Sequence, residues 1–257
     1  MELKNRTILV TGSNRGIGHA LCARLISEPV RLLAGVRDLN RFEPFPGGVA
    51  EVVPVRMDLA SRESIEACAA ELGEELERVD VLVNNAGEWV GGPLADTSED
   101  DIYEVVQANL AATLHLTRFV LPHMLRRRDG KIVNQSSIVA YNHFPGTAVY
   151  SATKAGITAL TNALRRELEG SGVTTLELIT GGTDTDMLDQ AAADLGPHTD
   201  TSKWESRDPD EWADMIVAAI EDDDERLEPS GKSKLARLAG AAPSGLMDQV
   251  SKRVFDR

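Results

Sequence analysis

Short apolar runs alternate with longer amphipathic stretches along most of the chain. The runs are rich in Val, Ile and Leu and end in glycine or polar residues, which is typical of strands that are buried on both faces. The stretches between them carry apolar residues at helical spacing. This pattern predicts strands at 6–12, 30–36, 50–58, 79–87, 130–137 and 173–180, and helices at 16–27, 61–77, about 99–126, 150–169 and 208–221.

Alternation of strands and helices predicts an α/β fold, a doubly wound (Rossmann-type) parallel sheet flanked by helices on both faces. The length of 257 residues suits one such domain, and no linker or repeat divides the chain. Two segments depart from the alternation. Residues 183–206 are polar and are expected to form an irregular, flexible lid over the substrate, and residues from about 226 to 257 are expected to form a mixed tail with one or two short helices.

Composition limits the classes of partner. The chain has 41 acidic and 27 basic residues, a net charge of −14, which disfavours binding to nucleic acid or to anionic membranes. It shows no signal peptide and no apolar run of the roughly 18 residues that a membrane helix needs. Cys22 and Cys68 form no disulfide framework, and the five histidines lack metal-ligand spacing. We therefore expect a cytoplasmic protein with no catalytic metal, no nucleic-acid partner and no membrane partner.

A glycine-rich loop, TGSNRGIG at 11–18, follows the first predicted strand and opens the first predicted helix. Gly12 permits a tight turn, Gly16 lets the backbone approach a ligand, and Gly18 allows close packing of the helix. A helix N-terminus at this place offers free amide groups and a positive dipole end to a pyrophosphate. The spacing Gly-x-x-x-Gly-x-Gly differs from the usual dinucleotide fingerprint, so ordinary turn chemistry is the alternative.

Four later motifs, in matching order and on the expected elements, resemble the short-chain dehydrogenase/reductase family of the compact single-domain type. They are NNAG at 84–87, Asn109, the serine pair 136–137 and Tyr150-x-x-x-Lys154, and the resemblance covers about residues 5–190. It implies a catalytic set of Asn109, Ser137, Tyr150 and Lys154, in which Asn109 holds a water that connects the lysine to solvent. It also implies a homodimer or homotetramer that packs through the helices near 99–126 and 150–169.

Tyr150 and Lys154 lie one helical turn apart, which places both side chains on the same face of a helix. Two unit charges about 4 Å apart, at an effective dielectric constant of about 20, interact by roughly 4 kcal/mol. That energy corresponds to about three pKa units and would bring a phenol toward neutrality, where it can give or take a proton. Ser137 rather than Ser136 is expected to bind the substrate oxygen, because adjacent strand residues face opposite sides. An amphipathic pair without chemistry is the alternative interpretation of the tyrosine and the lysine.

The residues after the second predicted strand bear on the choice of coenzyme. A ribose 2′-hydroxyl calls for a carboxylate there, whereas a 2′-phosphate calls for positive charge. Arg37, together with Arg15 in the glycine loop, supplies positive charge, while Asp38 comes one residue late. This favours NADP(H), with NAD(H) as the alternative. The full set expected to bind the coenzyme is Gly12, Ser13, Asn14, Arg15, Gly16, Ile17, Gly18, Arg37, Asp58, Leu59, Asn84, Ala86, Gly87, Tyr150, Lys154, Gly181, Thr183 and Thr185.

Several other positions carry weaker signals. The resemblance implies that Asp58 meets the adenine amino group, with a capping role as the alternative. The family usually has proline after the sixth strand, and Thr180 followed by two glycines predicts a more mobile edge of the site here. The arginine run 126–128 either docks an acidic carrier protein or stabilises a helix C-terminus. The residues expected to line the substrate pocket are Ser137, His143, Phe144, Tyr150 and Met187.

The sequence therefore predicts an NADP(H)-dependent oxidoreductase that interconverts a ketone or aldehyde and an alcohol by hydride transfer, with Tyr150 as the acid/base. The first alternative is an NAD-dependent alcohol dehydrogenase of the same family. The second is a regulatory protein that binds the dinucleotide without turnover. Acidic residues between 184 and 194 disfavour a highly anionic substrate.

Overall fold

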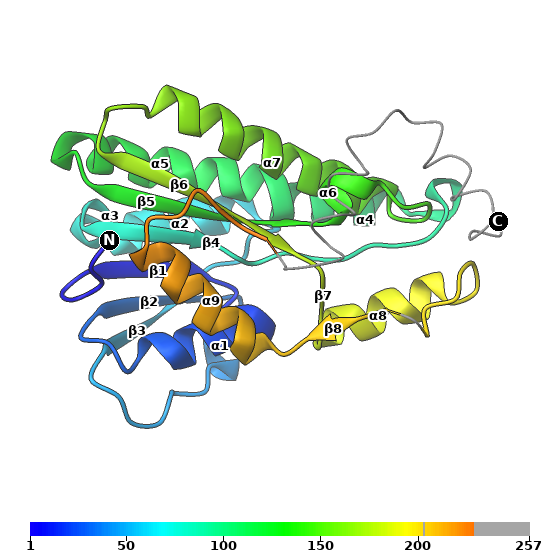
Figure 1. The fold of residues 1–257 in the computed structure, drawn as a ribbon, viewed down its shortest axis with the longest axis horizontal. Helices are drawn as coiled ribbons and strands as arrows, with labels where there is room; N and C mark the ends of the chain where they lie inside the picture. Colours follow the sequence, from blue (N-terminus) through cyan, green and yellow to red (C-terminus); the bar gives the residue numbers. More distant parts are fainter. Residues whose placement is uncertain (203, 229–257) are drawn as a thin grey trace.

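A seven-stranded parallel sheet forms the centre of the molecule in the computed structural model, which describes residues 1–202 and 204–228 (Figure 1). The strand order is β3-β2-β1-β4-β5-β6-β9, which confirms the doubly wound architecture. The strands are β1 (Thr7–Thr11), β2 (Arg31–Val36), β3 (Glu51–Arg56), β4 (Val79–Asn84), β5 (Gly130–Ser137), β6 (Val173–Thr180) and β9 (Arg226–Leu227).

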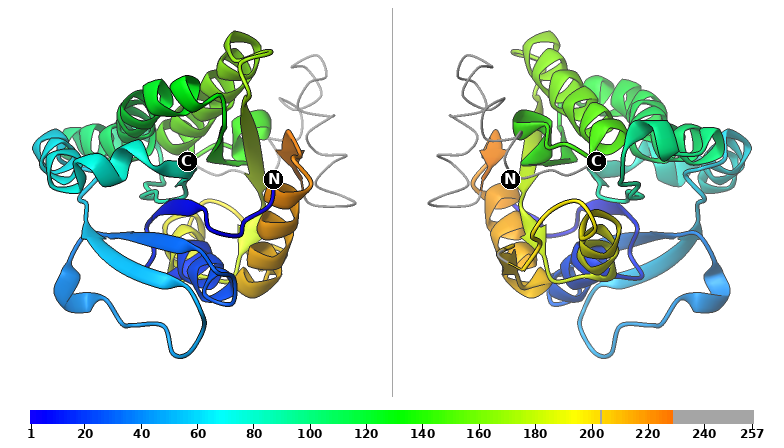
Figure 2. Two further views of the ribbon diagram at one scale, coloured as in Figure 1. Left: turned by 90° about the vertical axis from the view of Figure 1, so that its left-hand side faces the viewer. Right: turned by 90° about the vertical axis from the view of Figure 1, so that its right-hand side faces the viewer.

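Helices cover both faces of this sheet, with α1 and α9 on one side and α2, α5 and α7 on the other (Figures 1 and 2). Along β1, Ile8 and Val10 join the core beneath α1 and α9, whereas Leu9 joins the core on the opposite face. Burial on both faces explains why the strands are continuous apolar runs. The helices are α1 (Gly16–Leu25), α2 (Arg62–Leu72), α3 (Glu74–Glu77), α4 (Glu99–Val106), α5 (Ala112–Arg127), α6 (Val139–Asn142), α7 (Ala148–Glu167), α8 (Asp186–Leu195) and α9 (Pro209–Glu221).

Strand β1 lies between β2 and β4, and this position fixes where a ligand can bind. From β1 the chain moves outward through β2 and β3, then returns across β1 to build β4, β5 and β6. The loops after β1 and β4 therefore leave the sheet in different directions. A crevice opens between them at the carboxyl ends of the strands, as is general in open α/β sheets.

Two helices that the pattern predicts as continuous are interrupted. Gly73 adopts a left-handed conformation, with φ of 49°, and divides the predicted helix 61–77 into α2 and α3. Between α4 and α5, residues Gln107–Ala111 wind as a π-helix that carries Asn109. Such π turns inside α-helices are frequent at functional sites.

The segment expected to be an irregular lid contains a regular helix. It begins and ends in two short strands, β7 (Gly182–Thr183) and β8 (Ser206–Arg207), which pair in parallel and close its base. Between them lies the ten-residue helix α8, beside the carboxyl end of β6 (Figure 1). The expectation of an irregular segment is wrong because the many aspartates mask an amphipathic pattern, in which Ala191 and Leu195 are buried and Asp189 is exposed.

The C-terminal part adds one strand that the sequence pattern does not reveal. Strand β9 has two residues, too few for a periodic signal, and pairs with Glu177 and Leu178 of β6. The tail predicted from about 226 continues beyond it. Residues 229–257, with the short helices expected there, lie outside the described residues.

Candidate functional site

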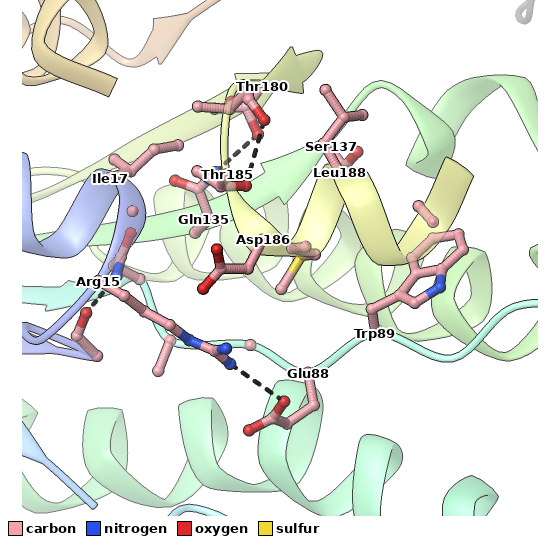
Figure 3. Close-up of a pocket in the computed structure, with 18 of the residues that line it drawn as sticks. Arg15, Ile17, Glu88, Trp89, Gln135, Ser137, Thr180, Thr185, Asp186 and Leu188 are labelled. Carbon is pink, nitrogen blue, oxygen red and sulfur yellow. Dashed lines mark hydrogen bonds and ion pairs between the residues drawn. The ribbon is translucent and has the colours of Figure 1, made fainter. Parts of the chain in front are cut away.

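The loops at the carboxyl ends of β1, β4, β5 and β6 line one elongated cleft of about 1110 Å³. Helix α8 and the start of α9 contribute to its opposite wall. Figure 3 shows Arg15 and Ile17 toward one end of this cleft and Ser137, Leu188 and Trp89 toward the other. The cleft occupies the crevice that the strand order predicts.

The glycine loop and the first turn of α1 form an open cradle at the Arg15 end. Gly12 and Gly16 have φ values of 71° and 55°, in the left-handed region that glycine favours. A Cβ atom on Gly18 would lie 2.2 Å from the Gly12 carbonyl oxygen and 2.4 Å from Asn85 Nδ2, so no larger residue fits there. Arg15, at the N-cap of α1, makes no side-chain capping bond, which leaves the first amide groups available to an anion. These features fit the pyrophosphate of a dinucleotide.

Most of the residues predicted to bind the coenzyme line this cleft, but three do not. Ser13 is fully buried and its hydroxyl donates to the Val10 carbonyl, while Gly18 packs inside the cradle. Asn84 points into the core and donates to Asn134 at 2.8 Å. The residues that do line the cleft are Gly12, Asn14, Arg15, Gly16, Ile17, Arg37, Asp58, Leu59, Ala86, Gly87, Tyr150, Lys154, Gly181, Thr183 and Thr185.

Asn85, the second asparagine of the NNAG motif, takes the position in the cleft that the sequence analysis gave to Asn84. Its Nδ2 donates to the Thr11 carbonyl at 2.8 Å, and its backbone amide donates to Thr11 Oγ1 at 3.0 Å. These bonds join the loop after β4 to the end of β1. The sequence could have indicated that only one of the two asparagines faces the cleft, because successive residues at a strand end face opposite sides.

Arg15 and Arg37 converge on one carboxylate that the sequence analysis did not identify. Nη2 of Arg15 lies 3.5 Å from Glu88 Oε2 (Figure 3). Nη1 of Arg37 lies 3.2 Å from Glu88 Oε1. Both arginines were expected to reach one 2′-phosphate, whereas Glu88 follows β4 and lies far from both in sequence. Asp38 does not join them, since its carboxylate accepts from the Asn40 backbone amide at 3.0 Å and caps a short helical turn.

Asp58 lines the cleft and also holds a local turn, while its contact with the adenine amino group stays a prediction. Its side chain lines the cleft, and its Oδ1 also accepts from the backbone amide of Ala60 at 3.1 Å. One carboxylate oxygen thus holds the local turn, while the side chain stays at the surface of the cleft near Met57 and Leu59.

Tyr150 and Lys154 lie near the start of α7 and are both buried, with 9% and 3% of their surface exposed. Lys154 Nζ lies 5.6 Å from the centroid of the Tyr150 ring and donates to the Gln135 carbonyl at 2.9 Å. Burial raises the pKa of the Tyr150 phenol above its usual value and lowers the pKa of Lys154 to about 8. The expected lowering of the phenol pKa is therefore wrong for this structure, because desolvation disfavours the charged form of both groups. Tyr150 keeps its proton at neutral pH.

Asn109 lies behind the cleft surface and holds the segment that covers Lys154. Its Oδ1 accepts from the Glu88 backbone amide at 2.7 Å, and its Nδ2 donates to the Glu88 carbonyl at 2.9 Å. A Cβ atom built on Gly87 would lie 3.3 Å from Asn109 Oδ1 and 3.6 Å from Lys154 Nζ. Asn109 and Lys154 thus approach the same glycine, while the water expected between lysine and solvent stays a prediction.

The two serines at the end of β5 face opposite sides, as alternation requires. Ser137 lines the cleft, whereas the Ser136 hydroxyl is 2.8 Å from Thr158 Oγ1, beneath α7. Ser137 is therefore the serine that a bound substrate can reach.

Thr180, where the family has proline, is tied to β5 through its hydroxyl. Its Oγ1 accepts from Gln135 Nε2 at 2.7 Å (Figure 3). It also donates to the Ser136 carbonyl at 3.4 Å. These two bonds join the carboxyl end of β6 to β5, while the greater mobility expected of this edge stays a prediction.

The substrate end of the cleft contains an aromatic wall that the sequence analysis missed. The ring of Trp89 lies 4.9 Å from the ring of Tyr150, and Met187 Sδ lies 3.9 Å from the Tyr150 hydroxyl. Phe144 lines the cleft, as predicted, with 44% of its surface exposed. His143 is exposed and does not line the cleft. The sequence could have placed Trp89 at the cleft, because this residue follows the NNAG motif after a single acidic residue.

The arginine run 126–128 has structural partners away from the cleft. Arg127 Nη2 donates to the Val79 carbonyl at 2.7 Å, and Arg128 Nη2 donates to the Gly170 carbonyl at 2.8 Å. Arg128 also ends α5 in a left-handed conformation. These bonds occupy two of the three guanidinium groups and support the helix-end interpretation over a carrier-protein site.

Comparison with known proteins identifies relatives along most of the chain. A family model described as short chain dehydrogenase matches residues 6–196. A short chain dehydrogenase of Pseudocercospora fijiensis is 32% identical over 72% of this chain. The matched region covers 62% of that relative, which is less than two thirds of its length. A 3-oxoacyl-acyl-carrier-protein reductase of Thermotoga maritima is 31% identical over 74% of this chain and 79% of the relative. A solved short-chain dehydrogenase from Sphingobium yanoikuyae, in complex with NADPH, matches with a TM-score of 0.78 and 25% identity over 95% of each chain.

Two further findings concern membranes and metals. None of the helices within residues 1–202 and 204–228 is long and apolar enough to cross a membrane. Within the same residues, no group of three or more His, Cys, Asp or Glu side chains has an arrangement that could hold a metal ion. Cys22 and Cys68 are both free and buried.

Proposed function

This chain belongs to the short-chain dehydrogenase family of oxidoreductases, and we propose that it uses NADP(H) to interconvert a ketone or aldehyde and an alcohol. The observation that carries the proposal is one cleft in which Ser137, Tyr150 and Lys154 share an end opposite the glycine cradle. The NADPH complex of the Sphingobium neighbour supports the choice of coenzyme. We propose that residues 1–257 form one catalytic domain, and the family match over residues 6–196 supports this.

The residues that would hold the dinucleotide come from several loops and from helix α7. The cradle around Gly12 and Gly16 suits the pyrophosphate, and Asn85, Lys154 and Thr185 line the continuation of the cleft. When bound, the coenzyme supplies the hydride, and the protein supplies position and charge. Arg15 and Arg37 would meet the 2′-phosphate that distinguishes NADP(H) from NAD(H).

Tyr150 acts as the proton donor during reduction. Its raised pKa keeps the phenol protonated at neutral pH, so it can give the proton to the carbonyl oxygen as negative charge develops there. The Ser137 hydroxyl donates a hydrogen bond to the same oxygen. Lys154 in its charged form stabilises the phenolate that remains. Alcohol oxidation uses the same groups in reverse, with Tyr150 as the proton acceptor.

A second candidate keeps this chemistry but takes a 3-oxoacyl thioester as substrate. The Thermotoga relative bears that activity in its name and is 31% identical over most of this chain. Both candidates use the same proton donor, and they differ in the size and charge of the group attached to the carbonyl.

We also propose a homodimer or homotetramer located in the cytoplasm. Tyr103, Val106 and Leu114 expose 75%, 37% and 46% of their surface along α4 and α5, and a second copy would cover them. Buried free thiols at Cys22 and Cys68 fit a reducing compartment.

The direct test is a coenzyme assay with a panel of carbonyl compounds. We expect NADPH consumption with at least one ketone or aldehyde, and slower consumption when NADH replaces NADPH at equal concentration. Equal use of both coenzymes would contradict the argument from Arg15 and Arg37, and faster consumption of NADH would favour the NAD-dependent alternative. Tight NADPH binding without consumption by any carbonyl compound would instead favour a regulatory protein without turnover.

A further inference from the structure

The cleft beside Tyr150 has an apolar wall on its lid side. Met187 and Leu188, in the first turn of α8, line the cleft, and Ala191 and Leu195 continue the same apolar face. Met187 already touches the Tyr150 hydroxyl at 3.9 Å. A group attached to the reacting carbonyl would therefore lie against carbon and sulfur atoms of the lid helix.

The indole of Trp89 also lines the cleft beside Tyr150, and its contacts hold it in one orientation. A Cβ atom on Gly91 would lie 2.5 Å from the Trp89 ring, so the ring rests directly on a residue that must be glycine. The indole Nε1 donates to Asp194 of α8 at 2.9 Å, and Gln190 donates to the other oxygen of Asp194 at 2.7 Å. Because its N–H is already bonded, Trp89 offers a substrate only its aromatic carbon surface.

Acidic side chains outnumber basic ones along the described lining of the cleft. Its Lys and Arg residues are the buried Lys154 together with Arg15, Arg37 and Arg41, and the arginines belong to the glycine loop and the segment after β2. Its acidic residues are Asp58, Glu88, Asp184, Asp186, Glu205, Asp208 and Asp210, of which the last five belong to the lid and the start of α9. This excess of negative charge disfavours a substrate that carries phosphate groups or is attached to an acidic carrier protein.

We infer that the substrate is an uncharged carbonyl compound with an apolar ring, an aryl or alicyclic ketone, and that Trp89 determines this specificity. The inference rests on the proposed function and names the substrate class for the same site. The ring packs against Trp89 and the Met187–Leu188 face, while Ser137 and Tyr150 bind the carbonyl oxygen. An acyl thioester on coenzyme A or on an acidic carrier protein is disfavoured by the acidic residues of the lid and of the start of α9.

The test compares three carbonyl probes with NADPH as reductant: acetophenone, 2-butanone and acetoacetyl-coenzyme A. We expect kcat/KM for acetophenone to exceed that for acetoacetyl-coenzyme A by about tenfold or more. In Trp89→Ala, kcat/KM for acetophenone should fall about tenfold further than for 2-butanone, whose small groups do not reach the indole. Trp89→Phe is the matched control, since it keeps an aromatic face and should lose less of the preference for acetophenone.

Each outcome has a distinct meaning. Efficient reduction of acetoacetyl-coenzyme A, or an equal loss for acetophenone and 2-butanone in Trp89→Ala, would overturn the inference while leaving the proposed function intact. No reduction of any probe by a wild-type protein that binds NADPH would overturn the proposed function itself. Leu188→Asn tests the Met187–Leu188 face should Trp89→Ala fail to fold, and it should lower the same ratio of acetophenone to 2-butanone.

Discussion

The phenol of Tyr150 contacts the indole of Trp89 and the thioether of Met187, and Lys154 lies beside its ring. Because these neighbours exclude water, the neutral forms of the phenol and the amine are both favoured. Proton donation by Tyr150 would leave negative charge in this buried place. A charged Lys154, with its Nζ 5.6 Å from the centroid of the Tyr150 ring, would stabilise that charge, so we expect the protonation of the lysine to affect the step.

We predict that kcat/KM for carbonyl reduction falls as the pH rises through about 8. Burial lowers the pKa of Lys154 to about 8, so the ammonium is present below this pH and is lost above it. The measurement is a pH profile of kcat/KM between about 6 and 10, with a probe ketone that does not titrate. A rate that stays constant up to pH 10 would show that the charge on Lys154 is not needed.

A second prediction concerns Glu88, which holds Arg15 and Arg37 through ion pairs. A 2′-phosphate must compete with this carboxylate for the same guanidinium groups. Glu88→Gln should therefore tighten NADPH binding by about two- to fivefold and change NADH binding much less. Coenzyme fluorescence titrations measure both dissociation constants, and Arg15→Ala is the opposite control, with weaker NADPH binding. Equal effects on NADPH and NADH, or weaker NADPH binding in Glu88→Gln, would contradict this account.

The residue-level prediction from sequence succeeded where local pattern determines position. Tyr150 and Lys154 share a helix face because of their spacing, and Ser137 faces the cleft because strands alternate. Glu88 and Trp89 were missed because their partners, Arg37 and Asp194, lie far away in sequence and meet them only through the fold. The pKa of Tyr150 was misjudged because burial cannot be read from spacing.

Helix α8 was not predicted, because its many aspartates obscured the helical spacing of its apolar residues. Its exposed aspartates suggested an irregular loop, yet its inward face is apolar and closes the cleft. The division of 61–77 at Gly73 and the π turn at 107–111 were likewise missed, since neither has a periodic signature. The six longer strands were predicted within a few residues, because burial on both faces makes them continuous apolar runs.

The junction of β5 and β6 gives a prediction about stability. Thr180 Oγ1 is the acceptor for Gln135 Nε2, whose own Oε1 has no hydrogen-bond partner in the described structure. Thr180→Val should lower the free energy of unfolding by about 1–3 kcal/mol, because it leaves a second buried polar atom of Gln135 unpaired. Urea unfolding measures the change.

Thr175→Val provides the matched control in the same strand. Its buried hydroxyl has no partner among the described residues, so its replacement by a methyl group should be neutral or stabilising. Equal losses of stability in Thr175→Val and Thr180→Val would show that the cross-strand bonds of Thr180 contribute nothing specific.

The molecule as a whole follows from strand–helix alternation, which fixes a parallel sheet and places the cleft beside β1 and β4. The topology of the sheet could be predicted from the sequence, because right-handed crossovers between parallel strands leave few possible arrangements. The sequence pattern could not predict β9, which has two residues and depends on its pairing with β6. Assembly of several copies is the next level, and we expect it to cover the exposed apolar side chains on α4 and α5.

We predict that the protein is a dimer or tetramer in solution and that Leu114→Asp weakens or abolishes this assembly. Leu114 exposes 46% of its surface on α5, and a buried unpaired carboxylate is costly at an interface. Leu39→Asp is the control, because Leu39 is similarly exposed, at 45%, but lies after β2. Light scattering coupled to size exclusion gives the masses. A monomeric wild-type protein, or an unchanged mass for Leu114→Asp, would contradict the predicted interface.

The most direct test of the central claim removes one oxygen atom from the active site. Tyr150→Phe keeps the ring against Trp89 and removes the phenolic proton, and it should be compared with the wild type in NADPH binding and in turnover of a reducible ketone. The account predicts that turnover falls by at least about a hundredfold, the lower end of the range expected when a general acid is lost. The NADPH dissociation constant should stay nearly unchanged. Turnover close to that of the wild type would show that Tyr150 is not the proton donor.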